Sequence, residues 1–165
     1  MLHMKKALSA LAISGAILTT SCANMGISSD PIAVTESTTI NASAADVWVE
    51  VGGFNSLARW HPAVKISRQL HDQRYLTLAN DAEIVEQETA RNEDAMSYSY
   101  RILSGPLPVE DYHATISVMP VGSDKAKVTW RSTFEAAGVS DSEAEDAIRG
   151  VYKAGLQQLN RMFVQ

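Results

Sequence analysis

Two stretches in the second half of the chain alternate between apolar and polar residues, at residues 111–118 and 127–135. Successive side chains of a β-strand point to opposite faces, so this period of two predicts strands with one face on a core and one in water. The inward faces are expected to be Tyr112, Ala114, Ile116 and Val118 in the first strand and Val128, Trp130, Ser132 and Phe134 in the second.

Weaker patterns predict further strands earlier in the chain. We expect them at about residues 32–40, 64–70, 74–78, 82–91 and 96–103. Asn80-Asp81 marks a turn between the third and fourth of these, and the polar "NED" separates the last two. The segment "SGPLPVED", residues 104–111, contains two prolines and is predicted to be a loop.

Helix signals flank this run of strands. Ser43-Ala-Ala-Asp46 has the spacing of a capping box and opens a short helix through about Val51, and "FNSLARW" adds one or two helical turns. Ser140-Asp-Ser-Glu143 is a second capping box, before the longest helix. Its apolar stripe recurs at spacings of three and four and comprises Ala144, Ala147, Ile148, Val151, Gly155, Leu159 and Met162.

Strands bracketed by helices indicate an α+β fold with an antiparallel sheet. A sheet of about seven strands curves, and one long C-terminal helix can cover its concave side. The covering stripe includes the small residues Ala144, Ala147 and Gly155, which leave space between helix and sheet. The sequence therefore predicts a cavity there, with Gly155 beside it.

The first 22 residues have the pattern of an export signal. Lys5 and Lys6 precede an uncharged apolar run, residues 7–18, which is too short to span a membrane. The sole cysteine, Cys22, ends "LTTSC", which resembles the bacterial lipobox and implies a lipidated N-terminus on the outer membrane. Ordinary cleavage would instead release a soluble periplasmic protein. We expect a signal at residues 1–22, a tether at 23–31 and one domain at 32–165.

Charge limits the choice of partners. Without residues 1–22 the chain has 12 basic and 19 acidic residues, a net charge of −7. Such a chain is repelled by phosphate backbones, so nucleic acid is not an expected partner. No phosphate-binding loop, nucleophile elbow or paired-cysteine motif occurs, and we predict neither a cofactor nor a metal site.

Several pieces of the chain, in a specific order, resemble the SRPBCC superfamily, whose START-like fold is called the helix grip. The matching pieces are "NASAADVWVEVGGFNSLARWHP", "RYLTL", "IVE", "YSYRILSGPLPVEDYHATISV", "VTWRSTFEA" and "GVYKAGLQQL". They are most similar to the polyketide cyclase/dehydrase and lipid-transport branch. The resemblance implies a ligand-binding domain, with two short helices after the first strand and the curved sheet wrapped on the C-terminal helix.

The resemblance also implies site residues. In lachrymatory factor synthase, of the same branch, an Arg and a Glu inside the cavity take part in the chemistry, and they match Arg74 and Glu86. The sequence supports an inward position, because both residues share a face with apolar neighbours and an unpaired buried charge is costly. A three-residue turn would set Arg74 opposite Glu88 and diagonal to Glu86. The pair is thus either an acid–base pair or part of a structural ion cluster with Glu88.

Four aromatic residues on inward strand faces, Tyr98, Tyr100, Tyr112 and Trp130, are either ordinary core or the lining of a pocket. With Arg74 and Glu86 they would orient a mostly apolar ligand by a few polar atoms. The "SGPLPVED" loop is expected to overhang the pocket mouth, or to be only a stiff turn.

His61, between Trp60 and Pro62, has no second His or Cys at ligand spacing, so we interpret it as structural. His71 is placed in a turn and His113 on a water-facing position.

The sequence is consistent with three functions. The leading hypothesis is an envelope protein that binds a small hydrophobic molecule (lipid, isoprenoid or polyketide-like) in an internal cavity. The second is a cyclase, dehydratase or isomerase that uses Arg74 and Glu86. The third is a lipoprotein scaffold without a ligand, because a fold alone does not guarantee a site.

Overall fold

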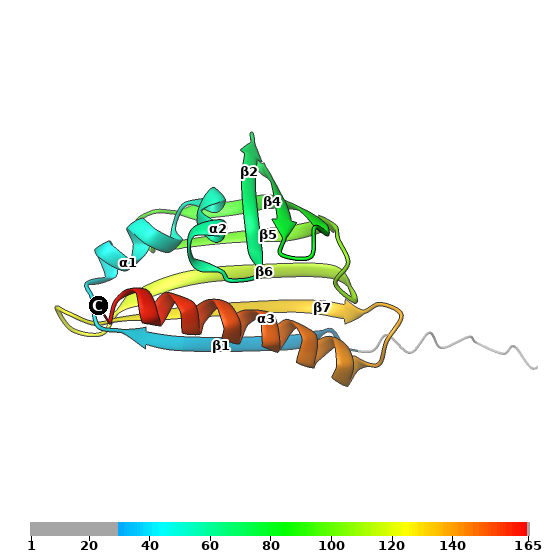
Figure 1. Ribbon diagram of the computed structural model, residues 1–165. Coiled ribbons are helices and arrows are strands. Elements are labelled where there is room, and N and C mark those ends of the chain that lie inside the picture. Colours follow the sequence, from blue (N-terminus) through cyan, green and yellow to red (C-terminus); the bar gives the residue numbers. More distant parts are fainter. Residues whose placement is uncertain (1–29, 165) are drawn as a thin grey trace, which may run out of the picture.

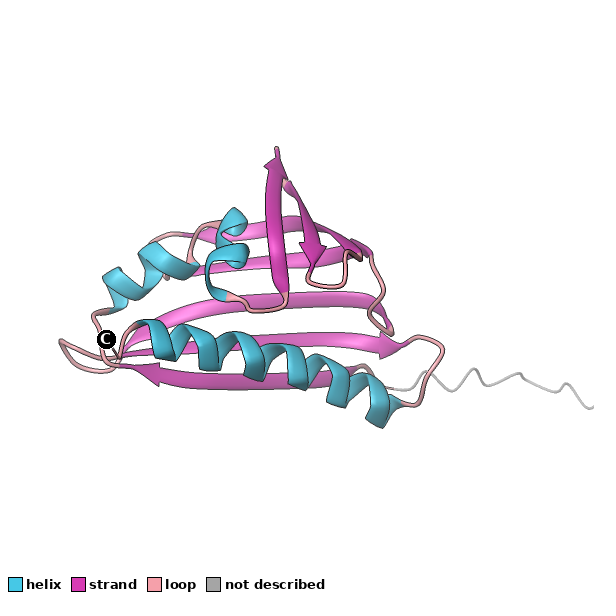
Figure 2. Ribbon diagram, viewed as in Figure 1, coloured by secondary structure: helices cyan, strands magenta, loops and turns pink. Residues whose placement is uncertain are grey.

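A single antiparallel sheet of seven strands forms the frame of the computed structural model, which describes residues 30–164 (Figures 1 and 2). The order across the sheet is β1-β7-β6-β5-β4-β3-β2, which places the first strand at one edge beside the last. The strands are β1 (Ile32–Ile40), β2 (Val64–Leu70), β3 (Gln73–Leu78), β4 (Glu83–Asn92), β5 (Ser97–Ser104), β6 (Val109–Pro120) and β7 (Ala126–Ala136).

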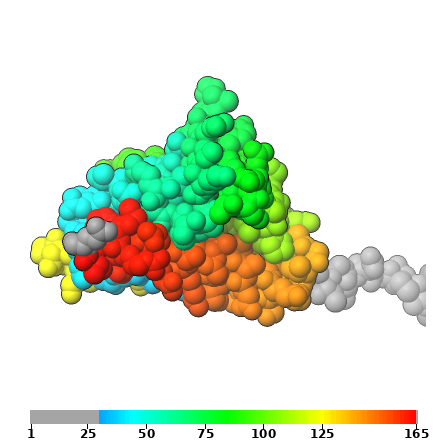
Figure 3. Space-filling model, viewed as in Figure 1, coloured from blue at the N-terminus to red at the C-terminus, as the bar shows by residue number. Residues whose placement is uncertain are grey.

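The helices gather on one face of this sheet. The long helix α3 (Asp141–Met162) runs along β1 and β7 (Figure 1). Helix α1 (Ala44–Val51) contacts β6 and β7, whereas the 3-10 turn η1 (Phe54–Ser56) and α2 (Leu57–Trp60) contact β2. In the space-filling view, α3 and the segment that contains α2 and β2 meet along a continuous surface (Figure 3). The predicted α+β helix-grip architecture is confirmed.

Both predicted helix starts are capped by serine. The backbone N–H of Glu143 donates to Ser140 Oγ at 3.3 Å, and the Glu143 carboxylate accepts from the Ser140 backbone N–H at 3.0 Å, a complete capping box. At α1 the backbone N–H of Asp46 donates to Ser43 Oγ at 3.2 Å, but the Asp46 carboxylate accepts from the Ser43 hydroxyl instead of the backbone. The sequence signals therefore locate both helices correctly.

The alternating strands β6 and β7 have the predicted orientation. Ile116 and Val128 are fully buried, whereas His113 and Arg131 on the other face are exposed. Burial of the inward faces under α3 forms the core, so hydrophobic transfer from water is the main force that holds helix to sheet. Within residues 30–164, no helix has the length and apolar character needed to cross a lipid bilayer.

The predicted loop at residues 104–111 is shorter in the structure. Strand β5 continues through Ser104 and β6 begins at Val109, which pairs with Ala136 of β7. A bulge at Glu110–His113, with Asp111 in the left-handed region at φ 47°, lets the strand pair early despite the nearby prolines. The expected signal at residues 1–22, with Cys22, and almost all of the expected tether lie outside the described residues.

Candidate functional site

A small cavity lies between the concave face of the sheet, α3 and the connection from α2 to β2. Its volume is about 80 Å³. Most of its wall is apolar, with Leu57 from α2, Leu76 from β3, Ile84 from β4, and Ile148 and Val151 from α3. The polar groups at the wall come from a smaller set, which comprises Glu86, His61, Tyr100, Tyr112 and Trp130.

Glu86 is held at the cavity by Arg74. The two residues are direct cross-strand partners on β4 and β3, and Arg74 Nε donates to the Glu86 carboxylate. Both side chains are buried, and Arg74 Nη1 also donates to the carbonyl oxygen of Phe54 at 2.6 Å. The pair thus ties the β3–β4 hairpin to η1.

Aromatic rings surround the Arg74 guanidinium. Its Cζ lies 4.3 Å from the ring centroid of Phe54 and 4.9 Å from that of Tyr100, distances at which a cation is attracted to a ring face. Burial alone lowers the pKa of Arg74, but the Glu86 carboxylate and the phenols of Tyr98 and Tyr100 more than offset this. The pKa of Arg74 therefore lies above its ordinary value, and the group stays charged.

The expectation that Arg74 faces Glu88 is wrong. The Leu78 N–H donates to the Ala82 carbonyl at 2.8 Å, so the hairpin turn consists of residues 79–81 and sets Arg74 opposite Glu86. Glu88 instead accepts from Arg91 Nε at 2.6 Å. The buried pair has one carboxylate, and Glu88 belongs to a separate ion pair nearer the surface.

Tyrosine and tryptophan side chains form a hydrogen-bonded cluster beside the cavity. Trp130 Nε1 donates to the Tyr100 hydroxyl at 3.0 Å, and the hydroxyls of Tyr112 and Tyr152 are hydrogen-bonded to each other. The rings of Trp130 and Tyr152 stack with centroids 4.3 Å apart. Burial raises the pKa of Tyr100, Tyr112 and Tyr152, so all three phenols remain protonated at neutral pH.

Tyr152 is a site residue that the sequence prediction missed. It lies four residues after Ile148 and three before Gly155, so it shares the buried stripe of α3. A tyrosine at a helix position of that spacing was the available signal. Phe54 was missed for a different reason, because its contact with Arg74 joins segments that are 20 residues apart.

His61 is structural, as predicted. The neutral imidazole satisfies both nitrogens within the chain: Nε2 donates to the Val151 carbonyl at 3.0 Å, and Nδ1 accepts from the Ala63 N–H at 3.2 Å. Desolvation by burial lowers the pKa of His61, although the Val151 hydrogen bond partly opposes this shift. The ring borders the cavity and fixes the start of β2 against α3.

Gly155 does not line the cavity. A Cβ built at this position would lie 2.6 Å from Cδ2 of His61 and 3.1 Å from the rings of Trp60 and Trp130. The small residue therefore admits large aromatic neighbours instead of leaving open space, and the cavity lies further along α3 beside Ile148 and Val151.

Two further predicted residues stand behind the cavity wall. Arg74 contacts two residues of the wall, Glu86 and Tyr100, and Tyr98 packs against Phe54 with ring centroids 5.8 Å apart. Within residues 30–164, Nη2 of Arg74 and the hydroxyl of Tyr98 are buried without a hydrogen-bond partner.

The β5–β6 connection borders the cavity, because Leu107 forms part of the wall; that it overhangs the pocket mouth stays a prediction. Among the described residues, no group of three or more His, Cys, Asp or Glu side chains is placed to hold a metal ion.

Comparison with known proteins gives a family match. Residues 31–163 match the family described as polyketide cyclase/dehydrase and lipid transport. The XoxI protein of Bacillus cereus is 34% identical, with a TM-score of 0.79 over 81% of this chain and 96% of that one. A putative uncharacterized protein of Bacillus thuringiensis is also 34% identical, with a TM-score of 0.80 over 81% and 100%. No curated protein matches the chain significantly.

More distant structures share the fold. The Zhui aromatase/cyclase of Streptomyces sp. R1128 is 13% identical, with a TM-score of 0.65 over 81% of this chain and 94% of that one. An identity this low shows the architecture alone.

Proposed function

Because the chain belongs to the polyketide cyclase/dehydrase and lipid-transport family of the SRPBCC (START-like) superfamily, we propose that it binds one small hydrophobic molecule beneath α3. The observation that carries this proposal is the apolar cavity, in whose wall Glu86 is the one acidic residue among residues 30–164. Apolar walls with a few fixed polar groups are typical of sites that hold hydrophobic ligands in a defined orientation.

The size of the cavity restricts how a ligand enters. Pockets for small molecules commonly measure roughly 300–1,000 Å³, well above the volume of about 80 Å³ seen here. A lipid, isoprenoid or polyketide-like molecule therefore requires part of the wall to move. Leu107 on the short β5–β6 loop is half-buried, and it lies at the wall without being part of a strand. We propose that displacement of this loop opens the site.

A cavity-filling variant tests the binding proposal. Val151→Phe places a larger ring against the cavity, whereas Lys153→Phe adds the same ring on the exposed side of α3. We expect Val151→Phe to weaken binding of the neutral fluorescent probe N-phenyl-1-naphthylamine by about tenfold, or about 1.4 kcal/mol, and Lys153→Phe to leave it unchanged. Equal binding by both folded variants would argue against a ligand in this cavity and favour a scaffold without a ligand.

A catalytic function is the second candidate, and the position of Glu86 favours it. Glu86 lines the cavity and its carboxylate is oriented by Arg74, so we propose that it accepts a proton from a bound molecule. The family description includes cyclases and dehydrases, so ring closure and dehydration are the reaction classes to test. Once a ligand is identified, Glu86→Gln should retain probe binding and lower single-turnover conversion by about 10²-fold or more if the protein is an enzyme.

The location of the protein is a separate proposal, supported by the sequence pattern of residues 1–22. We propose export and lipidation at Cys22, which would anchor the domain to the outer membrane facing the periplasm. Cys22→Ser should abolish incorporation of a clickable fatty acid and release the protein from the membrane fraction. Wild-type protein without label would instead favour ordinary cleavage and a soluble periplasmic form.

A further inference from the structure

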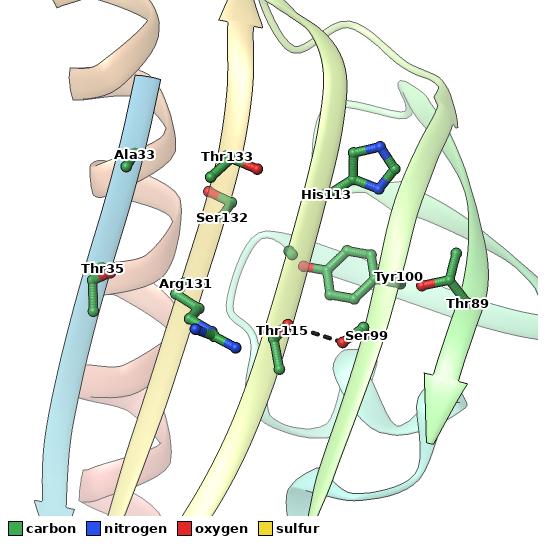
Figure 4. Close-up of a pocket in the computed structure, with 11 residues that line it drawn as sticks. Ala33, Thr35, Thr89, Ser99, Tyr100, His113, Thr115, Arg131, Ser132 and Thr133 are labelled. Atoms are coloured by element: carbon green, nitrogen blue, oxygen red, sulfur yellow. Dashed lines mark hydrogen bonds between the residues drawn. The ribbon is translucent and has the colours of Figure 1, made fainter. Parts of the chain in front are cut away.

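A second, larger hollow lies on the sheet face turned away from α3 (Figure 4). It has a volume of about 410 Å³ and crosses β1, β7, β6, β5 and β4. This volume falls within the range of small-molecule sites, unlike that of the smaller cavity beneath α3. We call this hollow the outer groove.

The side chains on the open face of the outer groove are hydrogen-bonding groups. Hydroxyls come from Thr35, Thr89, Ser99, Thr115 and Thr133, one from each of the five strands. The charged or basic side chains are Arg131 and His113, and among the described residues no Asp or Glu lines the groove. An acid-free, donor-rich surface is unusual on a chain with 19 acidic residues and a net charge of −5.

Strand register brings four of these side chains together. Arg131 of β7 is the direct partner of Thr115 on β6, and Thr133 is the partner of His113. The two pairs are adjacent on the same face, and direct cross-strand partners have Cβ atoms about 4.5–5.5 Å apart. The Thr115 and Ser99 hydroxyls are hydrogen-bonded at 2.9 Å, which extends the polar surface to β5 (Figure 4).

The Arg131 guanidinium is not neutralised by a carboxylate. Within residues 30–164, Arg59, Arg74, Arg91 and Arg149 each pair with Glu, whereas Arg131 forms neither an ion pair nor a side-chain hydrogen bond. A guanidinium offers its N–H groups in a planar fork that matches two oxygens of a phosphate or carboxylate. Arg131 is therefore free to bind an anion.

We propose that the outer groove binds a small soluble phosphate monoester with hydroxyl groups, such as a sugar phosphate. Figure 4 shows the Arg131 guanidinium turned toward Thr115 and the His113 ring turned away from it. Both side chains are exposed, and their rotation would bring Arg131, the His113 imidazole N–H and the hydroxyls of Thr115 and Thr133 to one anion, with more donors than the two oxygens of a carboxylate require. They suit the additional oxygens of a phosphate. The remaining volume lies along Thr35, Ser99 and Thr89, whose hydroxyls are complementary to those of a sugar.

The charge around the groove favours a soluble ligand over a membrane surface. Glu135 follows Thr133 on the outward face of β7 and is paired with Glu110 on β6. These carboxylates and the acidic chain repel an extended anionic bilayer, whereas a small phosphate can reach Arg131 without contact with them. We therefore expect modest, millimolar-range affinity and no binding to phosphatidylglycerol vesicles.

An NMR titration with glucose 6-phosphate tests this proposal. Amide shifts should move in β6 and β7 around residues 113–115 and 131–133, less strongly with inorganic phosphate and not with glucose. Arg131→Gln should weaken binding about tenfold or more, since charged hydrogen bonds are lost. Lys127→Gln, which removes a charge from the same face outside the groove, should change it less than about twofold. Glu135→Gln should strengthen binding.

Three results would overturn the proposal. The first is the absence of shifts in the outer groove at ligand concentrations up to tens of millimolar. The second is an equal loss in Arg131→Gln and Lys127→Gln, which would indicate attraction to overall charge. The third is binding to phosphatidylglycerol vesicles without binding to glucose 6-phosphate. None of these outcomes depends on the cavity beneath α3, so they leave the proposed function untouched.

Discussion

Arg74 and Glu86 are the residues whose burial has the largest consequence for stability. Each neutralises the other in the interior, and Arg74 also fixes η1 through the Phe54 carbonyl. A buried ion pair is not necessarily more stable than an apolar pair, but one charge left alone is strongly unfavourable. Loss of either partner should therefore cost more than loss of both.

Arg74→Met should lower the free energy of unfolding by about 3–5 kcal/mol, because it leaves the Glu86 carboxylate buried and unpaired. The double variant Arg74→Met, Glu86→Leu should recover a large part of this loss. Urea denaturation of the two single variants and the double variant measures the coupling.

The exposed pair of Arg59 and Glu50 provides the control. Its side chains are 57% and 23% exposed, so Arg59→Met should cost less than about 1 kcal/mol. If the double variant lost as much free energy of unfolding as the two single variants together, this would contradict a buried and coupled pair.

His61 should make stability depend on pH in a defined direction. The pKa of His61 in the folded protein lies below its ordinary value of 6.5, so below pH 6.5 the unfolded chain binds a proton that the folded chain excludes. Stability from this residue is complete above pH 6.5 and is lost as pH falls toward the folded pKa, by at most about 1.4 kcal/mol per pH unit.

The variant His61→Asn isolates this contribution, since the amide oxygen can still accept from the Ala63 N–H. We expect wild type to lose more stability than the variant between pH 7 and pH 5.5 in urea melts. The absolute stability of the variant does not matter, because the comparison uses slopes. Parallel pH curves would show that His61 is not held neutral by burial.

Among the elements, α3 connects the end of α2 with β7 through close contacts with aromatic rings. Gly155 lies where the helix meets Trp60, His61 and Trp130, and Tyr152 stacks on Trp130 one turn earlier. Because Gly155 has no side chain, α3 packs closely against α2 and β7 at this position.

Two glycines of α3 should respond in opposite ways to the same substitution. Gly155→Ala puts a methyl group 2.6 Å from His61 and should destabilise the fold by about 1–3 kcal/mol through overpacking. Gly150→Ala meets nothing within 4 Å and should stabilise it by up to about 1 kcal/mol, because alanine is the better helix former. Thermal melts that shift in the same direction for both variants would contradict this account.

The helices and strands could be predicted from the sequence because each is indicated by residues within the segment itself. Alternation gave the inward faces of β6 and β7, and the serine caps gave the starts of α1 and α3. The partner of Arg74 did not follow, because it depends on whether the turn begins at residue 79 or 80. Moving a hairpin turn by one residue moves the register by two, which exchanges Glu86 for Glu88.

Long-range contacts explain the other differences. A small residue in a helix stripe indicates close approach, but the sequence does not say whether a cavity or an aromatic ring lies opposite. At Gly155 the neighbours come from positions 60, 61 and 130, which only the folded chain brings together. The outer groove was missed for the same reason, because its hydroxyls lie on five strands.

At the scale of the whole molecule, the two faces of the sheet present different chemistry. The concave face, covered by α3, has an apolar cavity with Glu86 and buried phenols, while the outer face carries hydroxyls, Arg131 and His113. A cavity for a hydrophobic molecule on the concave face agrees with the family's description, whereas the strand register places the polar side chains together on the outer face. The central claim is that the covered face holds a hydrophobic molecule.

Native mass spectrometry of the protein purified from its own cells tests this claim most directly. We expect a peak heavier than the polypeptide by one small apolar molecule. That peak should persist in Lys153→Phe and be lost in Val151→Phe, with both variants folded. A wild-type spectrum with the polypeptide mass alone, and no molecule enriched over Val151→Phe in organic extracts, would contradict the account.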